Sequence, residues 1–379
     1  MDFTLDAEQE ALRDAVRGLL GKAYDTSETR RAVVGEDPGF GEKTWEQLAE
    51  MGVLGLPFAE ADGGMGAGPV EISIVSEEIG RVIAPEPFVE VVVLAGGLVA
   101  AAGSDEQRAD VLGRVAEGQL VLTAALAEPG ARWDPTGGGV TAKQDGDAWT
   151  LSGVKEPVLQ GARADALVVS AATAAGTGLF LVEGDAAGMT RTGYRTFEGG
   201  RGAHVAFDRT PAVALGDVTT DQASLVDDVV ARAQVAYCHE AIGAMDTALR
   251  ITVDYLKTRK QFGVTLSTFQ ALTFRAADLY VSMELVRSTV TWATLVLADE
   301  PERAREAAAR AKLQVSTAGR HIGEEAIQLH GGIGMTAEYS VGHYMSRLTA
   351  IDHWLGDGAE QLRVLSDSLD DHTVLEPLP

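Results

Sequence analysis

The sequence of 379 residues contains one cysteine, Cys238, and no long hydrophobic run. A single thiol excludes an intrachain disulfide or a cysteine-ligated metal site, and it suits a reducing compartment. The most apolar stretch, from Val91 to Gly103, is too short for the roughly 20 residues that cross a bilayer. The first twenty residues are acidic and amphipathic and lack the basic and apolar regions of a signal peptide. We therefore expect a cytoplasmic protein.

Positive charge is also scarce, because 31 Lys and Arg residues face 56 Asp and Glu residues and the formal net charge is -25. Such a surface repels phosphate backbones and anionic lipids, which disfavours binding to nucleic acid or to a membrane surface. It does not exclude an anionic ligand in a local basic pocket. Hydrophobic residues make up 46% of the chain and the mean hydropathy is +0.03, so a large core in two or three layers is expected.

Hydrophobic periodicity divides the chain into three parts. Residues 1–118 show helical spacing, with a glycine-rich loop before buried helices over 70–82 and 88–102. Residues 119–220 consist of short runs rich in Val, Thr and Leu, separated by Gly, Asp and Pro. Helical spacing returns over 221–379, where helices are predicted at 224–259, 267–297, 301–329 and 339–368. The prediction is a mainly helical α+β fold: an N-terminal helical domain, a middle β-barrel-like domain and a C-terminal four-helix bundle.

Two segments of the predicted bundle have the chemistry to hold a diphosphate. Arg259 ends a predicted helix, where a guanidinium can bind two phosphate oxygens, and Phe262 offers an apolar face to an adenine or a ribose. Gly331 and Gly332, behind Gln328, allow backbone N–H groups to approach a phosphate closely. By themselves, these residues are better explained as a solvated helix end, a core phenylalanine and a glycine helix cap.

Several fragments, in this order and spacing, resemble the acyl-CoA dehydrogenase family over roughly residues 1–363. They are MDFTLDAEQEALRDAVRGLL, LAEMGVLGLPFAEADGGMG, ALAEPGARWDP, YLKTRKQFGVTLSTFQAL and QLHGGIGMTAEYSVGHYM. The resemblance implies FAD as cofactor and an acyl-CoA as substrate, which loses its α-proton to a carboxylate while the β-hydrogen leaves as hydride to the flavin. It also implies that the ADP half of a neighbouring subunit's FAD is gripped by Arg259, Gln261, Phe262, Leu266, Gln270, Gln328, Gly331 and Gly332.

The flavin end departs from the family pattern. Ala127 stands where a Thr hydroxyl is usual and Trp133 where a small Ser is usual, and a Trp–Thr pair is replaced by Pro157 and Leu159. Apolar side chains cannot supply the hydroxyl hydrogen bonds that a flavin ring receives. A slip of the alignment by one or two residues is the alternative explanation.

The catalytic base is also missing from its usual position, since Leu355 occupies the place of the Glu in the commonest family pattern. In the minority pattern, with the Glu on the first bundle helix, the position is Ala233. Glu240, two turns further along an apolar run, is the candidate base, because burial raises a carboxyl pKa toward neutrality. Pairing of Glu240 with Arg or His across the bundle is the competing interpretation; Asp352, His353 and Asp357 are weaker candidates.

The resemblance therefore supports several hypotheses. In the first, the chain is part of a heterotetramer and completes the FAD site of a paralogous subunit. This heterotetramer desaturates an acyl-CoA, such as one with a sterol side chain, and electron-transfer flavoprotein accepts the electrons. In the second, it is a homotetrameric dehydrogenase that uses Glu240 as base. In the third, it is a CoA-thioester-binding homologue without oxidoreductase activity. A branch with other flavin chemistry, such as a hydroxylase or nitroalkane oxidase, is a further alternative.

Overall fold

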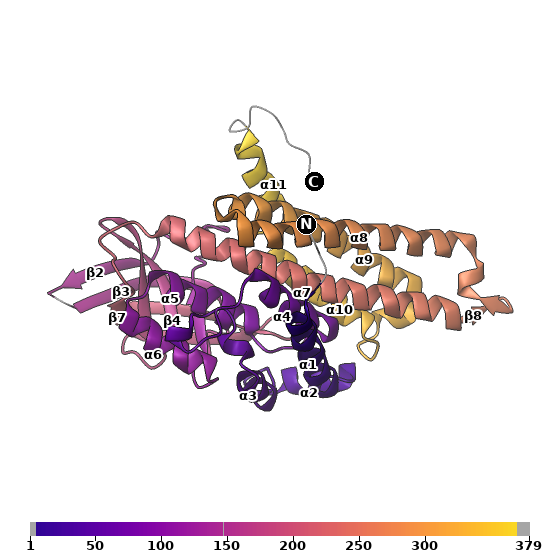
Figure 1. Ribbon diagram of the computed structural model, residues 1–379, viewed down its shortest axis with the longest axis horizontal. Helices are drawn as coiled ribbons and strands as arrows, with labels where there is room; N and C mark the ends of the chain where they lie inside the picture. Colours follow the sequence, from indigo (N-terminus) through magenta and orange to yellow (C-terminus); the bar gives the residue numbers. More distant parts are fainter. Residues whose placement is uncertain (1–4, 147, 370–379) are drawn as a thin grey trace.

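The computed structural model describes residues 5–146 and 148–369. Helices come first, a β-sheet domain follows, and a bundle of long helices completes the chain (Figure 1), so the predicted fold class is confirmed. The N-terminal helices are α1 (Ala7–Ala23), α2 (Ser27–Gly35), α3 (Glu42–Glu50), α4 (Pro69–Val82), the π-helix η3 (Val89–Gly96), α5 (Gly97–Ala102) and α6 (Asp105–Ala116), with short 3₁₀ turns η1 (Val53–Gly55) and η2 (Glu60–Asp62).

Two glycines set the distance between the N-terminal helices and the bundle. A Cβ on Gly80 of α4 would lie 1.8 Å from the carbonyl oxygen of Glu240, and one on Gly243 would lie 2.0 Å from the carbonyl oxygen of Glu77. Both glycines are therefore needed for backbone-to-backbone contact between α4 and α7 (Ala223–Thr258). This contact places the charged groups of α7 beside those of the N-terminal domain.

The middle domain is a sheet that closes on itself. Its strands are β1 (Leu122–Ala125), β2 (Thr141–Asp145), β3 (Ala148–Leu159), β4 (Ala166–Thr173), β5 (Gly176–Glu183), β6 (Met189–Arg195) and β7 (Arg201–Ala214). The order β4-β2-β3-β7-β5 returns to β4 through an antiparallel β4–β5 ladder, while β1 pairs with β4 and β6 with β7. The predicted barrel-like domain thus has a closed ring of strands around its own apolar core.

The C-terminal bundle contains α7, α8 (Gln270–Asp299), α9 (Ala304–His330), α10 (Val341–His353) and α11 (Gly358–Asp367), with 3₁₀ turns η4 (Leu266–Thr268), η5 (Pro301–Arg303) and η6 (Gly331–Met335). The single helix predicted over 339–368 is wrong, because the chain breaks after His353. Leu355 and Gly356 adopt positive φ angles of 59° and 102°, and Asp357 then caps α11 by accepting a hydrogen bond from the Glu360 amide. The break turns residues 354–357 toward the β domain.

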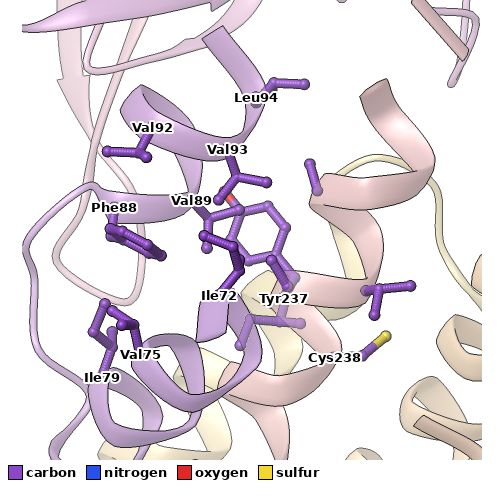
Figure 2. Close-up of a cluster of buried hydrophobic side chains, with 14 of the residues drawn as sticks. Ile72, Val75, Ile79, Phe88, Val89, Val92, Val93, Leu94, Tyr237 and Cys238 are labelled. Atoms are coloured by element: carbon purple, nitrogen blue, oxygen red, sulfur yellow. The ribbon is translucent and has the colours of Figure 1, made fainter. Parts of the chain in front are cut away.

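One apolar core joins the N-terminal helices to the bundle, and a second fills the β domain. Figure 2 shows the joint core, with Tyr237 reaching from α7 toward the helix that carries Val89 and Val93. Cys238 is buried on the neighbouring position of α7, where burial raises the pKa of its thiol to about 12. Across residues 5–146 and 148–369, no helix combines the length and apolar character that a bilayer crossing requires.

Candidate functional site

The RKQFG segment forms an exposed β-hairpin beyond the end of α7. Strands β8 (Lys260–Gln261) and β9 (Val264–Thr265) pair across a two-residue turn, and the Arg259 carbonyl accepts a hydrogen bond from the Leu266 amide, which closes the loop. Phe262 and Gly263 occupy the turn with φ angles of 54° and 83°. Positive φ at both central residues is the pattern of a type I′ turn, which fixes the hairpin tightly.

Phe262 is the most unusual residue of the hairpin. Its side chain is 92% exposed and meets the ring of Phe269 edge-on, with ring centroids 6.1 Å apart. A bulky residue in the left-handed region costs of order 1–3 kcal/mol. A strained turn that holds an aromatic ring in solvent has the properties of a binding element rather than of a core position.

The guanidinium of Arg259 lies at the base of the same hairpin. Lys257 and Lys260 flank it, so three cations fall within four residues of a chain whose net charge is -25. Arg259 is exposed and forms no side-chain hydrogen bond or ion pair within the part of the chain that the structure describes. The hairpin therefore presents a local positive charge beside an apolar ring, as a diphosphate and its nucleoside require.

The second predicted segment lies directly beside the hairpin. Tyr255, one turn before Arg259, packs on His330 with ring centroids 4.5 Å apart, and His330 packs on Tyr339 at 4.9 Å. This aromatic cluster brings the end of α9 and the turn at Gly331 and Gly332 to the end of α7. A Cβ on either glycine would meet no atom within 4 Å, so the turn faces open space.

The remaining predicted contacts occupy the same end of the bundle. Gln328 is exposed on the last turn of α9, and Gln261 and Gln270 are exposed on the hairpin and at the start of α8. Leu266 is half-buried and packs against the core. The structure thus places the eight predicted residues on two adjoining segments, and their contact with a nucleotide stays a prediction.

The residues of the predicted flavin wall also form one site, and its own cavity is small. Ala127, Pro157, Leu159 and Leu355, from the loop after β1, strand β3 and the turn after α10, line a cavity of about 90 Å³. Cofactor pockets are typically about 300–1,000 Å³. The positions that depart from the family pattern therefore converge in space around a small cavity, and a second cavity of about 560 Å³ adjoins it at Trp133 and Leu355.

Large aromatic side chains occupy this region. Trp133 and Trp354 line the cavity from its two sides, and Tyr237 lines it from α7. The ring of Trp133 meets His353 edge-on, with centroids 6.5 Å apart. The break after His353 places Trp354 and Leu355 in the lining of this cavity, and Leu355 supplies an apolar side chain where the family pattern has a carboxylate.

The loop with the sequence AEPG is held by a buried ion pair. Glu128 accepts hydrogen bonds from the amides of Gly138, Gly139 and Val140, at 3.1, 2.6 and 3.0 Å. Lys155, with a side chain that is 0% exposed, donates to Glu128 at 2.7 Å. Burial opposes the charged carboxylate, but these donors outweigh it and lower the pKa of Glu128. Glu128 therefore fixes the loop and leaves no lone pair for a substrate.

Glu240 lies in a second buried network. Arg347 of α10 donates to both of its carboxylate oxygens, at 2.6 and 3.1 Å, and also to Glu198, at 3.1 and 3.2 Å. Glu240 is 1% exposed. The structure therefore shows the cross-bundle pairing of the competing interpretation. A carboxylate held by both oxygens is poorly placed to accept a proton, although its catalytic role stays untested.

Two groups of this region were missed by the sequence analysis. Glu90 of η3 lines the 90 Å³ cavity, and burial raises the pKa of its carboxyl. A lone carboxylate in the apolar run PFVEVVVLAGG is the same signal that singled out Glu240, so this one was available. Arg347 carried no such signal, since its partners lie 107 and 149 positions away in the sequence.

The acyl-CoA dehydrogenase N-terminal, middle and C-terminal domains match residues 6–119, 123–209 and 228–369. The chain belongs to the acyl-CoA dehydrogenase family, whose members are FAD-dependent oxidoreductases.

Among its relatives is acyl-CoA dehydrogenase FadE27 of Mycobacterium tuberculosis strain H37Rv, which is 30% identical over 97% of this chain and 99% of its own. A Tcur3481-Tcur3483 steroid ACAD variant is 34% identical with a TM-score of 0.89, covering 97% of this chain and 99% of that one. The ChsE4-ChsE5 complex from M. tuberculosis contains a chain that is 28% identical with a TM-score of 0.89, covering 99% and 100%.

The family's cofactor fits the two ends of this chain unequally. Arg259, Phe262 and the turn at Gly331 offer charge, an apolar ring and open backbone to an ADP group. The wall where the isoalloxazine ring would lie offers apolar side chains, around a cavity of about 90 Å³ that adjoins one of about 560 Å³. The residues present thus suit the nucleotide half of FAD, but Ala127, Pro157 and Leu159 lack the hydroxyl groups that would hydrogen-bond to its ring.

Proposed function

We propose that this chain is the FAD-site-completing subunit of a heteromeric acyl-CoA dehydrogenase, working in the cytoplasm. Its hairpin and the Gly331 turn grip the ADP half of an FAD whose ring lies in a paralogous subunit. The assembly desaturates an acyl-CoA between Cα and Cβ and passes electrons to electron-transfer flavoprotein. The proposal rests on the contrast, within one chain, between an exposed, cationic ADP grip and a ring wall of apolar side chains without hydroxyl donors.

Exposed apolar residues support assembly with another subunit. Phe274, Tyr280, Val281 and Leu285 of α8 are each more than half exposed, and Met335 of η6 is 77% exposed. Apolar side chains gathered on helices next to the ADP grip are typical of a subunit interface. The likeness to a chain of the ChsE4-ChsE5 complex and to a steroid ACAD supports an unlike partner and a substrate with a bulky steroid-like acyl group.

The test compares the chain alone with the chain co-expressed with an acyl-CoA dehydrogenase encoded beside it. Alone, the chain should show little flavin absorbance; the co-purified pair should be yellow and should reduce an electron acceptor with an acyl-CoA. Arg259→Ala should lower the flavin content of the pair, whereas Arg320→Ala, which removes an exposed α9 arginine, should not. A lone chain that purifies yellow and turns over an acyl-CoA would refute the heteromeric assignment.

The homotetrameric alternative predicts a different effect of substituting Glu240. If Glu240 is the base, Glu240→Gln should abolish turnover while FAD stays bound. Under our proposal, Glu240→Gln in the assembled pair leaves the chemical step of the partner's site in place, because Glu240 serves the ion pair with Arg347.

A further inference from the structure

A large cavity lies outside the region described above. It measures about 580 Å³ and lies between the start of α4, the helices η3 and α5, and the first half of α7. It shares no lining residue with the 90 Å³ cavity. Helix α7 lies between the two cavities. Its residues Gln234 and Tyr237 face the flavin wall, whereas Arg232 and Val235 line the 580 Å³ cavity.

The walls of this cavity are apolar and built from small side chains. Phe58, Ile72, Val92, Val93 and Val229 form its buried surface. On the α5 side the residues are glycine and alanine, at Gly97, Ala100 and Ala101. These small side chains leave the space that a larger residue would fill, and the volume is that of a typical small-molecule site.

One cation, Arg232, lies at the rim of this cavity. Arg232 is exposed and lines the cavity, and it forms no side-chain hydrogen bond or ion pair within residues 5–146 and 148–369. Asp228, one turn earlier on α7 and also in the lining, is bound by Arg305 at 2.8 Å. The acid nearest to Arg232 along the helix is therefore neutralised, which leaves the positive charge of the arginine available to a ligand.

At the inner side, His239 adds a polar group that is neutral. Thr294 Oγ1 donates its hydrogen to the Val290 carbonyl at 3.1 Å, so the 2.6 Å contact with His239 Nε2 makes that nitrogen the donor. Burial lowers the pKa of His239 to about 3, and its Nδ1 has no hydrogen-bond partner among the described residues. The cavity thus has one free charge, at its rim, and no buried charge to repel an apolar body.

We propose that this cavity binds an amphipathic carboxylate, with its apolar body between α4, α5 and α7 and its carboxylate at Arg232. The ligand class is a free medium- or long-chain carboxylic acid, and the site is separate from the acyl-CoA site of the assembled enzyme. The proposal does not depend on the heteromeric function, because every residue involved belongs to this chain and none to the ADP grip.

Calorimetric titration of the full chain with dodecanoate, below its micelle concentration, tests the proposal. Dodecanoate should bind, and dodecanol should bind about fivefold more weakly, as the loss of one exposed ion pair implies. Arg232→Gln should remove that difference between acid and alcohol. Ala101→Phe should lower the affinity for both ligands at least tenfold by filling the cavity, whereas Ala11→Phe, which adds the same ring to an exposed position on α1, should not.

The possible results of these titrations test different parts of the proposal. No binding to the wild-type chain, or binding unchanged by Ala101→Phe, would overturn the cavity as a ligand site. Equal affinity for acid and alcohol in the wild-type chain would overturn the role of Arg232 and the carboxylate class. Circular dichroism and the urea midpoint of each variant identify any that fail to fold, and Ala100→Phe is the second filling variant if Ala101→Phe is one of them. Flavin content is not a readout here, so failure of this proposal is distinct from failure of the proposed function.

Discussion

Arg347 holds two buried carboxylates at the junction of the N-terminal domain, the β domain and the bundle, so its removal should be strongly destabilising. Its guanidinium bonds Glu240 from α7 and Glu198 from the loop between β6 and β7, at distances between 2.6 and 3.2 Å. The exposed fractions of the three side chains are 12%, 1% and 4%. Arg347→Met keeps most of the side-chain volume and leaves both carboxylates buried without their cation.

Breaking a buried ion pair by removing one partner costs about 3–5 kcal/mol, because the remaining charge loses its compensation and stays desolvated. Domains of this kind are stable by about 5–15 kcal/mol in total. We therefore expect Arg347→Met to lower the free energy of unfolding by about 3–5 kcal/mol in urea titrations followed by tryptophan fluorescence. Adding Glu240→Gln to this variant should restore part of the loss, since one of the two uncompensated charges is then removed.

The control is Arg363→Met on α11, where an exposed arginine pairs with Glu360 and Asp367. Exposed pairs contribute little, so the unfolding midpoint of this variant should match that of the wild-type chain. A loss below about 1 kcal/mol for Arg347→Met would refute the reasoning. Such a result would show that the stability of the buried carboxylates does not depend on Arg347. Glu240 would then again be a candidate base.

Three further predictions concern single side chains. Burial raises the pKa of Glu86 from about 4.5 to about 7, so the stability that this carboxyl contributes is fully present below pH 4.5 and is lost as pH rises through 7. Glu86→Gln should therefore reduce the decline in unfolding free energy between pH 5 and pH 8 by on the order of 3 kcal/mol. Urea titration of both proteins at both pH values measures this difference. Gly80→Ala should destabilise the folded chain by roughly 3 kcal/mol, because the added Cβ clashes with the Glu240 backbone. The control Gly18→Ala, on the exposed surface of α1, should stabilise the chain by up to about 1 kcal/mol. Equal thermal midpoints for the two variants would contradict this. Phe262→Ala should leave the stability of the chain unchanged, because the ring is 92% exposed, but should weaken FAD retention by the co-purified pair in a dialysis series.

The three-part architecture was predictable because each part has its own local pattern. The 3.6-residue period of α7 and the short Val- and Thr-rich runs of β4 and β5 are visible without any long-range information. The predicted ADP segments also converge, and the contact between Tyr255 and His330 explains why. That contact joins residues 75 positions apart, so the sequence could suggest it only through the family resemblance.

Long-range pairing and helix breaks were harder to predict. The period of α10 continues across Trp354 and Leu355, so the pattern alone predicted one helix over 339–368. Gly356 and the capping residue Asp357 were the local signals of a break. The partner of Glu240 could not be predicted, because periodicity assigns a residue to a helix face and does not say which side chain of another helix faces it.

We propose that this chain binds the ADP half of FAD and does not hold the flavin ring itself. The most direct measurement is the number of FAD molecules per pair of unlike chains in the purified complex, from flavin absorbance after denaturation and the protein concentration. The account predicts one FAD per pair, since only the paralogous chain would offer a ring site. Two FAD molecules per pair would show that the wall formed by Ala127, Pro157, Leu159 and Leu355 opens to receive a ring, and would contradict it.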